Sequence, residues 1–314
     1  MAFVEELRTK FEEWLRRVPG FEEARVAGIV PVEGGVSNLT YRVRLEGAPR
    51  PAVALRLQRR EGIFQPYNVV REAEVLRRLQ MSPVPVPEVI GIEWDTEALG
   101  ARFIVLEWID APHMGEAGPE ADFGAFTRMV AQIHALDWRE YGLDFLGVPL
   151  NIENAVLGEV AAVARRMKAF ECDDDPLLRR ALSLLQTKRP TEGTLSLCHG
   201  DINVFNYLFR GGEVVGVVDW EQARISDPRS DVGQLLALSH LKGAPFGPAG
   251  DMPFVQAYQE AAARALDSME YFRAFWLFQL TVIYHGFVRL SGTEPWFTLP
   301  DLTRLLEASL DELN

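Results

Sequence analysis

The alternation of apolar and polar positions predicts a small sheet-containing region at the start of the chain. Apolar side chains recur at helical spacing over residues 3–18, with charges between them, which predicts an amphipathic helix. Residues 24–47 hold two β-rich runs around Gly34-Gly35, and residues 51–60 hold a third, so we expect an antiparallel meander. Helical spacing returns over residues 69–79, the proline-rich residues 82–90 cannot continue that helix, and residues 101–110 form a further strand.

The pattern beyond residue 110 is mainly helical. Helical spacing covers residues 123–136, 154–170 and 175–186, a β-rich island follows over residues 195–218, and four more helical patterns reach the end of the chain. We therefore expect an α+β protein with a small sheet-plus-helix lobe over residues 1–109 and a larger, mainly helical lobe over residues 110–314.

Composition and charge narrow the classes of partner. The 314 residues are 48% hydrophobic, enough for packed cores, and 45 acidic against 32 basic residues give a formal net charge of −13. That charge repels nucleic-acid phosphates and anionic membranes, so we expect neither as a partner.

The two cysteines, Cys172 and Cys198, are too few for a disulfide framework, which favours a reducing, cytoplasmic location. Charged and polar residues interrupt the apolar stretch 271–288, which predicts a buried helix instead of a membrane span, and the first helix lacks the continuous apolar core of a signal peptide.

The sequence HGDINVFN, residues 199–206, carries the candidate chemistry. Asp201 stands five residues before Asn206, and the apolar run YLF, a turn with two glycines and a returning strand then lead to Asp219. Such a hairpin brings Asn206 and Asp219 to the same end. Phosphoryl transfer requires Mg²⁺ held by oxygen ligands and a carboxylate that orients the attacking hydroxyl. The pattern predicts Asp201 as the base and Asn206 and Asp219 as Mg²⁺ ligands; a capping Asp with two turn residues is the structural alternative.

These motifs, HGDINVFN followed by VVDWE and DPRSDVG, resemble the signature of the aminoglycoside phosphotransferase family, small-molecule kinases with a protein-kinase-like fold. The segments VPVPEVIG and FIVLEWIDA resemble the branch of that family linked to acyl-CoA dehydrogenases. The resemblance implies ATP as the nucleotide, with GTP used by some relatives, Mg²⁺ as the metal and a small-molecule hydroxyl as the acceptor. It leaves the oligomeric state open.

The resemblance also implies nucleotide-binding residues in the first lobe. The segment EGGVSN, residues 33–38, stands where the family covers the phosphates, so backbone N–H groups at Ser37 and Asn38 are candidate phosphate contacts, although a plain hairpin turn has the same appearance. The third strand presents Arg56 where the family usually has a lysine, and Glu72, in preference to Glu74, is its expected partner.

The adenine contacts implied by the family register lie in FIVLEWID, where Glu107 offers its C=O and Ile109 its N–H, with Leu106 at the back of the pocket. An ordinary buried strand explains the same apolar residues. In the second lobe Asp231 matches the acidic residue that braces the catalytic loop, but it could equally belong to a helix start capped by Asp227. His199 is expected to orient the loop by hydrogen bonding.

Three classes of function compete. The first is a kinase acting on a small molecule, with antibiotics among the candidate acceptors, and the second is a nucleotide-binding pseudokinase in which Arg56 marks lost catalysis. The third, a protein kinase, is disfavoured because seven residues between Asp219 and Asp227 are too few for a peptide-docking activation segment. No residue identifies the acceptor: the acidic run ECDDD, residues 171–175, would suit a cationic one, and the aromatic residues of 271–288 would suit a bulky apolar one.

Overall fold

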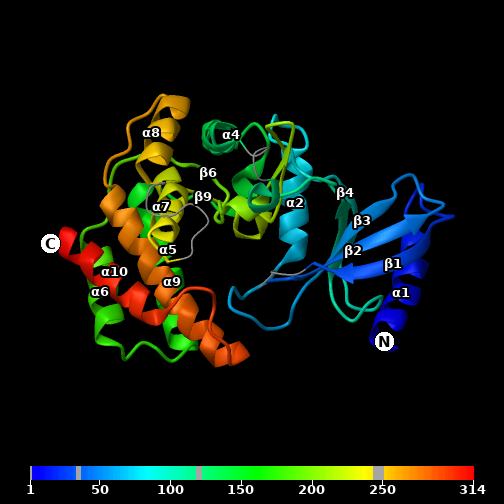
Figure 1. Ribbon diagram of the computed structural model, residues 1–314, viewed down its shortest axis with the longest axis horizontal. Helices are drawn as coiled ribbons and strands as arrows, with labels where there is room; N and C mark the ends of the chain where they lie inside the picture. Colours follow the sequence, from blue (N-terminus) through cyan, green and yellow to red (C-terminus); the bar gives the residue numbers. More distant parts are fainter. Residues whose placement is uncertain (1, 33–36, 118–121, 243–250) are drawn as a thin grey trace. The chain divides into compact units, whose positions relative to one another are not determined.

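The computed structural model describes residues 2–32, 37–117, 122–242 and 251–314. The chain forms two compact units. The first comprises Met1–Ala111 together with Val215–Glu221, and the second comprises Pro112–Val214 and Gln222–Asn314. Figure 1 shows the sheet within the first unit and the helices that make up most of the second.

The first unit is built on a five-stranded antiparallel sheet. Its order is β1 (Arg25–Pro31), β2 (Leu39–Glu46), β3 (Ala52–Leu57), β5 (Phe103–Glu107) and β4 (Val89–Glu93). The first three strands form the meander that the sequence predicts. Strand β4 was not predicted: it follows the prolines of residues 82–90 and pairs along the sheet edge, where an interrupted ladder is tolerated.

Two helices cover opposite faces of this sheet. Helix α1 (Ala2–Leu15) packs Phe11 and Trp14 in one hydrophobic cluster with Val53 and Leu55 of β3. Helix α2 (Val69–Leu79) packs against β4 and β5. Because successive side chains of a strand point to opposite faces, Arg56 of β3 projects away from the α1 cluster and toward α2.

The second unit is mainly helical. Its long buried helix, α9, packs against α5, α6, α7 and α10, and α4 packs against α8. The residues expected to form a buried helix, 271–288, lie inside α9, and no helix among the described residues has the length and apolar character needed to cross a membrane. The helices of the unit are α3 (Met114–Ala117), α4 (Phe123–Ala135), α5 (Ile152–Ala169), α6 (Pro176–Thr187), α7 (Pro228–Ser239), α8 (Asp251–Ala262), α9 (Met269–Ser291) and α10 (Leu299–Glu312).

Short strands frame the HGDINVFN segment. Strand β6 (Ser196–Cys198) pairs antiparallel with β9 (Arg224–Ser226), and β7 (Tyr207–Arg210) forms a two-stranded sheet with β8 (Glu213–Val217). The turn between β7 and β8 is made by Gly211 and Gly212 at φ of 59° and 84°, a conformation that favours glycine. The predicted hairpin is therefore present. Strand β9 was not predicted because three residues are too short to give a periodic signal.

The α7–α9 contact generates a stability prediction. A Cβ on Gly233 of α7 would lie 2.7 Å from Cβ and 2.8 Å from the backbone C of Phe272 in α9. We expect Gly233→Ala to lower the free energy of unfolding by about 1–3 kcal/mol, because the close helix contact cannot absorb the methyl group. Gly158→Ala is the matched control: no atom lies within 4 Å of a Cβ there, in the interior of α5, so the change should raise stability by about 0.5–1 kcal/mol. Urea unfolding of both variants checks this, and equal stabilities would contradict the packing argument.

Candidate active site

The HGDINVFN segment leaves β6 through a tight backbone turn. Gly200 has φ of 86°, and a Cβ on it would lie 2.4 Å from the backbone O of Gln222. Only glycine fits both the left-handed conformation and the close approach. His199, just before it, is fully buried and accepts a hydrogen bond on Nδ1 from the N–H of Asp201 at 3.2 Å. This matches the orienting role expected of His199.

The backbone of this turn is anchored on the carboxylate of Asp231. Oδ2 of Asp231 accepts the N–H of His199 at 2.7 Å, and Oδ1 accepts the N–H of Gly200 at 3.1 Å. Asp227, meanwhile, caps α7 by accepting the N–H of Arg229 at 2.9 Å. The two roles that the sequence left open for this segment are thus divided between two aspartates: Asp227 starts the helix, and Asp231, one turn later, holds the loop.

The carboxylate of Asp231 also binds a histidine that the sequence analysis did not assign. Nε2 of His134 lies 3.2 Å from Oδ2 of Asp231, and Nδ1 lies 2.7 Å from the hydroxyl of Tyr258. Burial pushes the pKa of Asp231 upward, but the His134 hydrogen bond and the charge of Arg224 outweigh it and hold the pKa below its ordinary value. The ionised carboxylate accepts Nε2–H, so Nδ1 is left to accept the hydroxyl proton of Tyr258.

This cluster is a hydrogen-bonded network and not a metal centre. His134, Cys198 and Asp231 offer ligand atoms within 4.8 Å of one another. Both ring nitrogens of His134 and both oxygens of Asp231, however, already have hydrogen-bond partners. Burial and the nearby Asp231 charge raise the pKa of the Cys198 thiol, so it stays protonated and is a poor ligand.

The carboxylate of Asp201 is held by amide donors. Gln234 of α7 donates Nε2–H to Oδ1 at 2.6 Å, and Asn206 donates Nδ2–H to Oδ2 at 3.1 Å and to the backbone O of Asp201 at 2.9 Å. Asn203 adds a longer contact at 3.3 Å. Because its amide nitrogen is engaged in this way, Asn206 keeps its Oδ1 as the atom able to ligate a cation. The structure thus brings Asp201 and Asn206 together.

In the first unit, Arg56 lies among three carboxylates. Its Nε is 2.9 Å from Glu72 of α2, and its Nη2 is 2.5 Å from Asp219 and 3.0 Å from Glu221. Glu74, the less favoured partner in the sequence analysis, instead pairs with Arg78 at 2.8 Å. Asp219 has φ of 66°, an uncommon conformation for a residue other than glycine that is often found at functional sites.

Asp219 is the carboxylate of this cluster that is suited to a divalent cation, because burial and repulsion favour the protonated forms of Glu72 and Glu221. Burial, and then the charges of Asp219 and Glu221, raise the pKa of Glu72 to about 8, although Arg56 opposes them. Burial and the Asp219 charge likewise raise the pKa of Glu221. The carboxylate of Asp219 is a hard oxygen donor, so the residues present fit Mg²⁺.

The candidate phosphate-contacting residues are partly described. Residues 33–36 of the EGGVSN segment lie outside the described residues, whereas Ser37 and Asn38 are buried. Asn38 donates Nδ2–H to Glu221 at 2.8 Å and accepts the N–H of Arg59 on Oδ1 at 3.2 Å. Glu221 thus joins Asn38 to the Arg56 cluster, and Ser37 also hydrogen-bonds to Glu221.

The two candidate adenine contacts lie at the end of β5. Glu107 is its last residue; its carboxylate is 3.0 Å from Arg50, and its N–H donates to the backbone O of Glu88 at 2.8 Å. Ile109 lies just beyond the strand, and its C=O accepts the N–H of Ala111 at 3.0 Å. Leu106 is 7% exposed.

Several residues of these networks were not predicted from the sequence, among them His134, Gln234 and Glu221. Gln234 stands three residues after Asp231, on the same face of α7, so helical spacing offered a signal. Glu221 directly follows the DW of the VVDWE motif. His134 had no local signal, because its partners Asp231 and Tyr258 are remote in sequence.

Comparison with known proteins gives a family match over most of the chain. The profile of the phosphotransferase enzyme family matches residues 28–272. Acyl-CoA dehydrogenase family member 10 of Mus musculus is 25% identical over 231 residues, which cover 70% of this chain and 21% of that protein. The chain spans between 21% and 35% of the length of the first curated relatives it matches.

Two solved structures illustrate the fold. A type I macrolide 2'-phosphotransferase has a TM-score of 0.63 at 20% identity, covering 100% of this chain and 97% of that chain. A thermostable mutant of the aminoglycoside phosphotransferase APH(4)-Ia, in a ternary complex with ADP and hygromycin B, has a TM-score of 0.64 at 14% identity, covering 98% and 97%. At these identities the likeness concerns the fold, and it confirms the predicted α+β, protein-kinase-like class.

The Asp231 network generates a pH-dependent prediction. Asp231→Asn should lower the free energy of unfolding at pH 7 by about 3–5 kcal/mol, because a buried charge that several donors share is removed. Since the folded-state pKa of Asp231 lies below its unfolded value of about 3.9, its contribution is present above about pH 4 and is lost as the pH falls through the folded-state pKa. The gap in the free energy of unfolding between wild type and variant should therefore narrow below about pH 4.

Urea unfolding between pH 7 and pH 3 measures this gap. Asp311→Asn is the control, because that side chain is 71% exposed and pairs with Arg180 on the surface. A gap of constant size across the pH range would contradict the ionised state assigned to Asp231.

Proposed function

Because the chain belongs to the phosphotransferase enzyme family, as its motifs predict, we propose that it is a Mg²⁺-dependent kinase that transfers the γ-phosphoryl group of ATP to a hydroxyl of a small molecule. The observation that carries the proposal is the fixed carboxylate of Asp201, held by Gln234 and Asn206 in a loop anchored on Asp231. A carboxylate held by donors on both oxygens is an acceptor only and is suited to orient a hydroxyl.

Asp201 acts as the base in this proposal. Gln234 binds one oxygen of the carboxylate and Asn206 binds the other, which fixes the orientation of the carboxylate. Asp201 aligns the acceptor hydroxyl and takes its proton as the O–P bond forms and the bond to ADP breaks. Oδ1 of Asn206 and the carboxylate of Asp219 supply the Mg²⁺ ligands. When bound, Mg²⁺ neutralises charge on the transferring phosphates.

The nucleotide is assigned to the first unit. The C=O of Glu107 and the N–H of Ile109 face the adenine edge, Ser37 and Asn38 lie beside the phosphates, and Arg56, oriented by Glu72, contributes positive charge there. The ADP complex of the related aminoglycoside phosphotransferase supports an adenine nucleotide. We favour ATP over GTP because Leu106 leaves room for adenine.

In this proposal the acceptor is a small-molecule alcohol bound by the mainly helical second unit, and the first unit, which includes Val215–Glu221, is the nucleotide-binding lobe. The macrolide and aminoglycoside phosphotransferases with the same fold make antibiotics the first acceptors to test. The free, buried thiols of Cys172 and Cys198 favour the reducing cytoplasm as the site of action.

Replacement of Asp201 tests the proposal. In Asp201→Asn the amide cannot accept a proton, so turnover should fall by a factor of about 10²–10⁴, with nucleotide affinity little changed. The measurement is Mg²⁺-dependent ATP consumption against aminoglycosides, macrolides, nucleoside antibiotics, choline, homoserine and hydroxy acids, together with ADP binding. Asp311→Asn serves as the surface control. Nucleotide binding without turnover on any acceptor would point to a pseudokinase, and unchanged turnover in Asp201→Asn would remove Asp201 from the mechanism.

The Arg56→Lys variant tests the role of the arginine that stands where the family usually has a lysine. A lysine ammonium cannot reproduce the fork by which Arg56 reaches Glu72, Asp219 and Glu221, so the Kd for Mg·ADP should change by at least about threefold. Arg304→Lys, at a position on α10 that is 67% exposed, is the control for a charge-conserving change. Identical affinity and rate would give Arg56 a structural role.

A further inference from the structure

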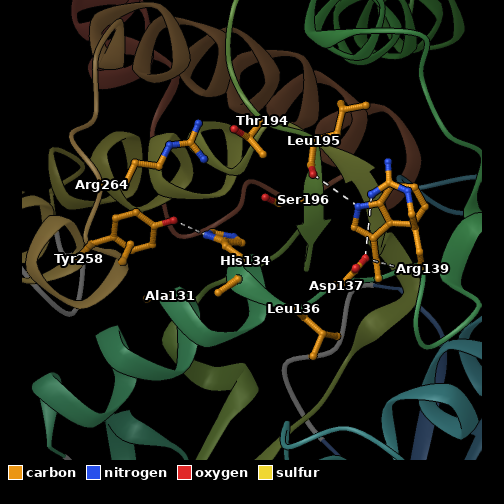
Figure 2. Close-up of a pocket in the computed structure, with 13 residues that line it drawn as sticks. Ala131, His134, Leu136, Asp137, Arg139, Thr194, Leu195, Ser196, Tyr258 and Arg264 are labelled. Atoms are coloured by element: carbon orange, nitrogen blue, oxygen red, sulfur yellow. Dashed lines mark hydrogen bonds and ion pairs between the residues drawn. The ribbon is translucent and has the colours of Figure 1, made fainter.

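A pocket in the second unit lies outside the residues assigned to catalysis. It has a volume of about 320 Å³, the lower end of the range for small-molecule sites. The end of α4, the chain entering β6 and the end of α8 form its walls (Figure 2). It is lined by Ala131, His134, Ala135, Leu136, Asp137, Trp138, Arg139, Thr194, Leu195, Ser196, Tyr258, Ala262 and Arg264.

The charges of the lining favour an anion. Two arginines, Arg139 and Arg264, face one carboxylate, Asp137, in a protein whose net charge is −13. Arg139 lies over the ring of Trp138 at 3.9 Å and is 4.0 Å from Asp137. Within the described parts of the chain, no carboxylate pairs with Arg264. Its guanidinium is therefore the positive charge available to a ligand.

Hydroxyl groups line the same pocket as that charge. In Figure 2 the side chain of Arg264 extends from the α8 side toward Thr194, and Ser196 also lines the pocket. A guanidinium and two hydroxyls in one pocket form a donor set that suits a carboxylate or a phosphate. The small apolar side chains of Ala131, Ala135 and Ala262 leave room for a short aliphatic body, whereas a bulky one would exceed the volume.

The inner wall of the pocket is connected to the catalytic loop. Tyr258 and His134 line the pocket, and their hydrogen bond is drawn in Figure 2. The other ring nitrogen of His134 binds Asp231, which in turn accepts the N–H groups of His199 and Gly200. A ligand that restrains Tyr258 thus acts on the first link of a continuous chain of hydrogen bonds that ends at the catalytic loop.

We propose that this pocket binds a small organic anion, with its carboxylate or phosphate on Arg264 and its short aliphatic part against the alanines, and that Tyr258, His134 and Asp231 transmit its binding to the catalytic loop. Binding orders Tyr258 and thereby stabilises the hydrogen bonds that hold the loop, so the anion is an effector distinct from nucleotide and acceptor. Neither the binding of the anion nor its effect on the loop depends on which acceptor the enzyme phosphorylates.

Calorimetric titration tests binding. Butyrate and inorganic phosphate are the probes for the two anionic groups, and 1-butanol is the neutral counterpart of butyrate. We expect at least one anion to bind the wild-type chain with a Kd of about 1 mM or tighter, and 1-butanol to bind at least tenfold more weakly. Arg264→Ala should weaken anion binding at least about tenfold, because a charge-assisted hydrogen bond is lost, whereas Arg304→Ala on α10 should bind as wild type does. Absence of anion binding, or equal binding in Arg264→Ala and wild type, would overturn the site.

Amide hydrogen exchange tests the coupling without any assay of catalysis. The anion that binds should slow exchange of the His199 and Gly200 amides at least about threefold, and 1-butanol should leave it unchanged. In Tyr258→Phe the anion should still bind, but the slowing should disappear because the link to His134 is cut. Unchanged exchange in the anion-bound wild type would overturn the coupling by itself, even if the Tyr258→Phe variant did not fold. Slowing that persists in a folded Tyr258→Phe would also overturn the proposed route.

Discussion

One buried carboxylate, Asp231, organises the second unit around the HGDINVFN loop. It is completely buried, and it remains ionised because backbone N–H groups, a histidine and the charge of Arg224 all stabilise the negative form. A loop with a left-handed glycine and a close backbone approach has little stability of its own. The fixed charge beneath it supplies the acceptor that its N–H groups need, and Asp201 is thereby held in place.

The position of Asp231 depends in turn on how α7 is packed. Asp227 caps the helix, Gly233 allows the close contact with Phe272 of α9, and Trp276 of α9 donates its indole N–H to the backbone O of Ser230 at 2.5 Å. Helix α7 also supplies Gln234, which bonds to the carboxylate of Asp201. A single helix therefore carries both the anchor of the HGDINVFN loop and a direct support of the proposed base, so the hydrophobic packing of α9 and the position of the loop are coupled.

In the first unit, the charged side chains are clustered around one arginine. Three carboxylates, Glu72, Asp219 and Glu221, surround the guanidinium of Arg56, and all its contacts lie between 2.5 and 3.0 Å. A planar fork can serve several carboxylates at once, which an ammonium group does less well, and this gives a physical reason for arginine at this position. Within the cluster, the carboxylate of Asp219 is the hard oxygen donor that the proposed function assigns to Mg²⁺.

The sequence predicted the elements that carry a periodic signal and missed those that depend on distant partners. The meander, the helix over residues 69–79 and the glycine hairpin followed from local patterns. Strand β4, next to prolines, and the three-residue β9 did not, because each exists only through its pairing partner. In the candidate site, the spacing of Asp201 and Asn206 predicted that the two side chains lie together, as they do. His134 and Tyr258 were missed because 124 residues separate them and only the fold brings them together.

The second unit depends on an ionised Asp231, and the carboxyl carbon of that residue reports on its ionisation directly. The ¹³Cγ chemical shift of Asp231, followed by NMR as the pH is lowered, should keep the value of an ionised carboxylate below the ordinary aspartate pKa of about 3.9. A titration midpoint at or above that ordinary value would contradict the claim, because a protonated Asp231 could not accept the hydrogen bonds of His199, Gly200 and His134 together.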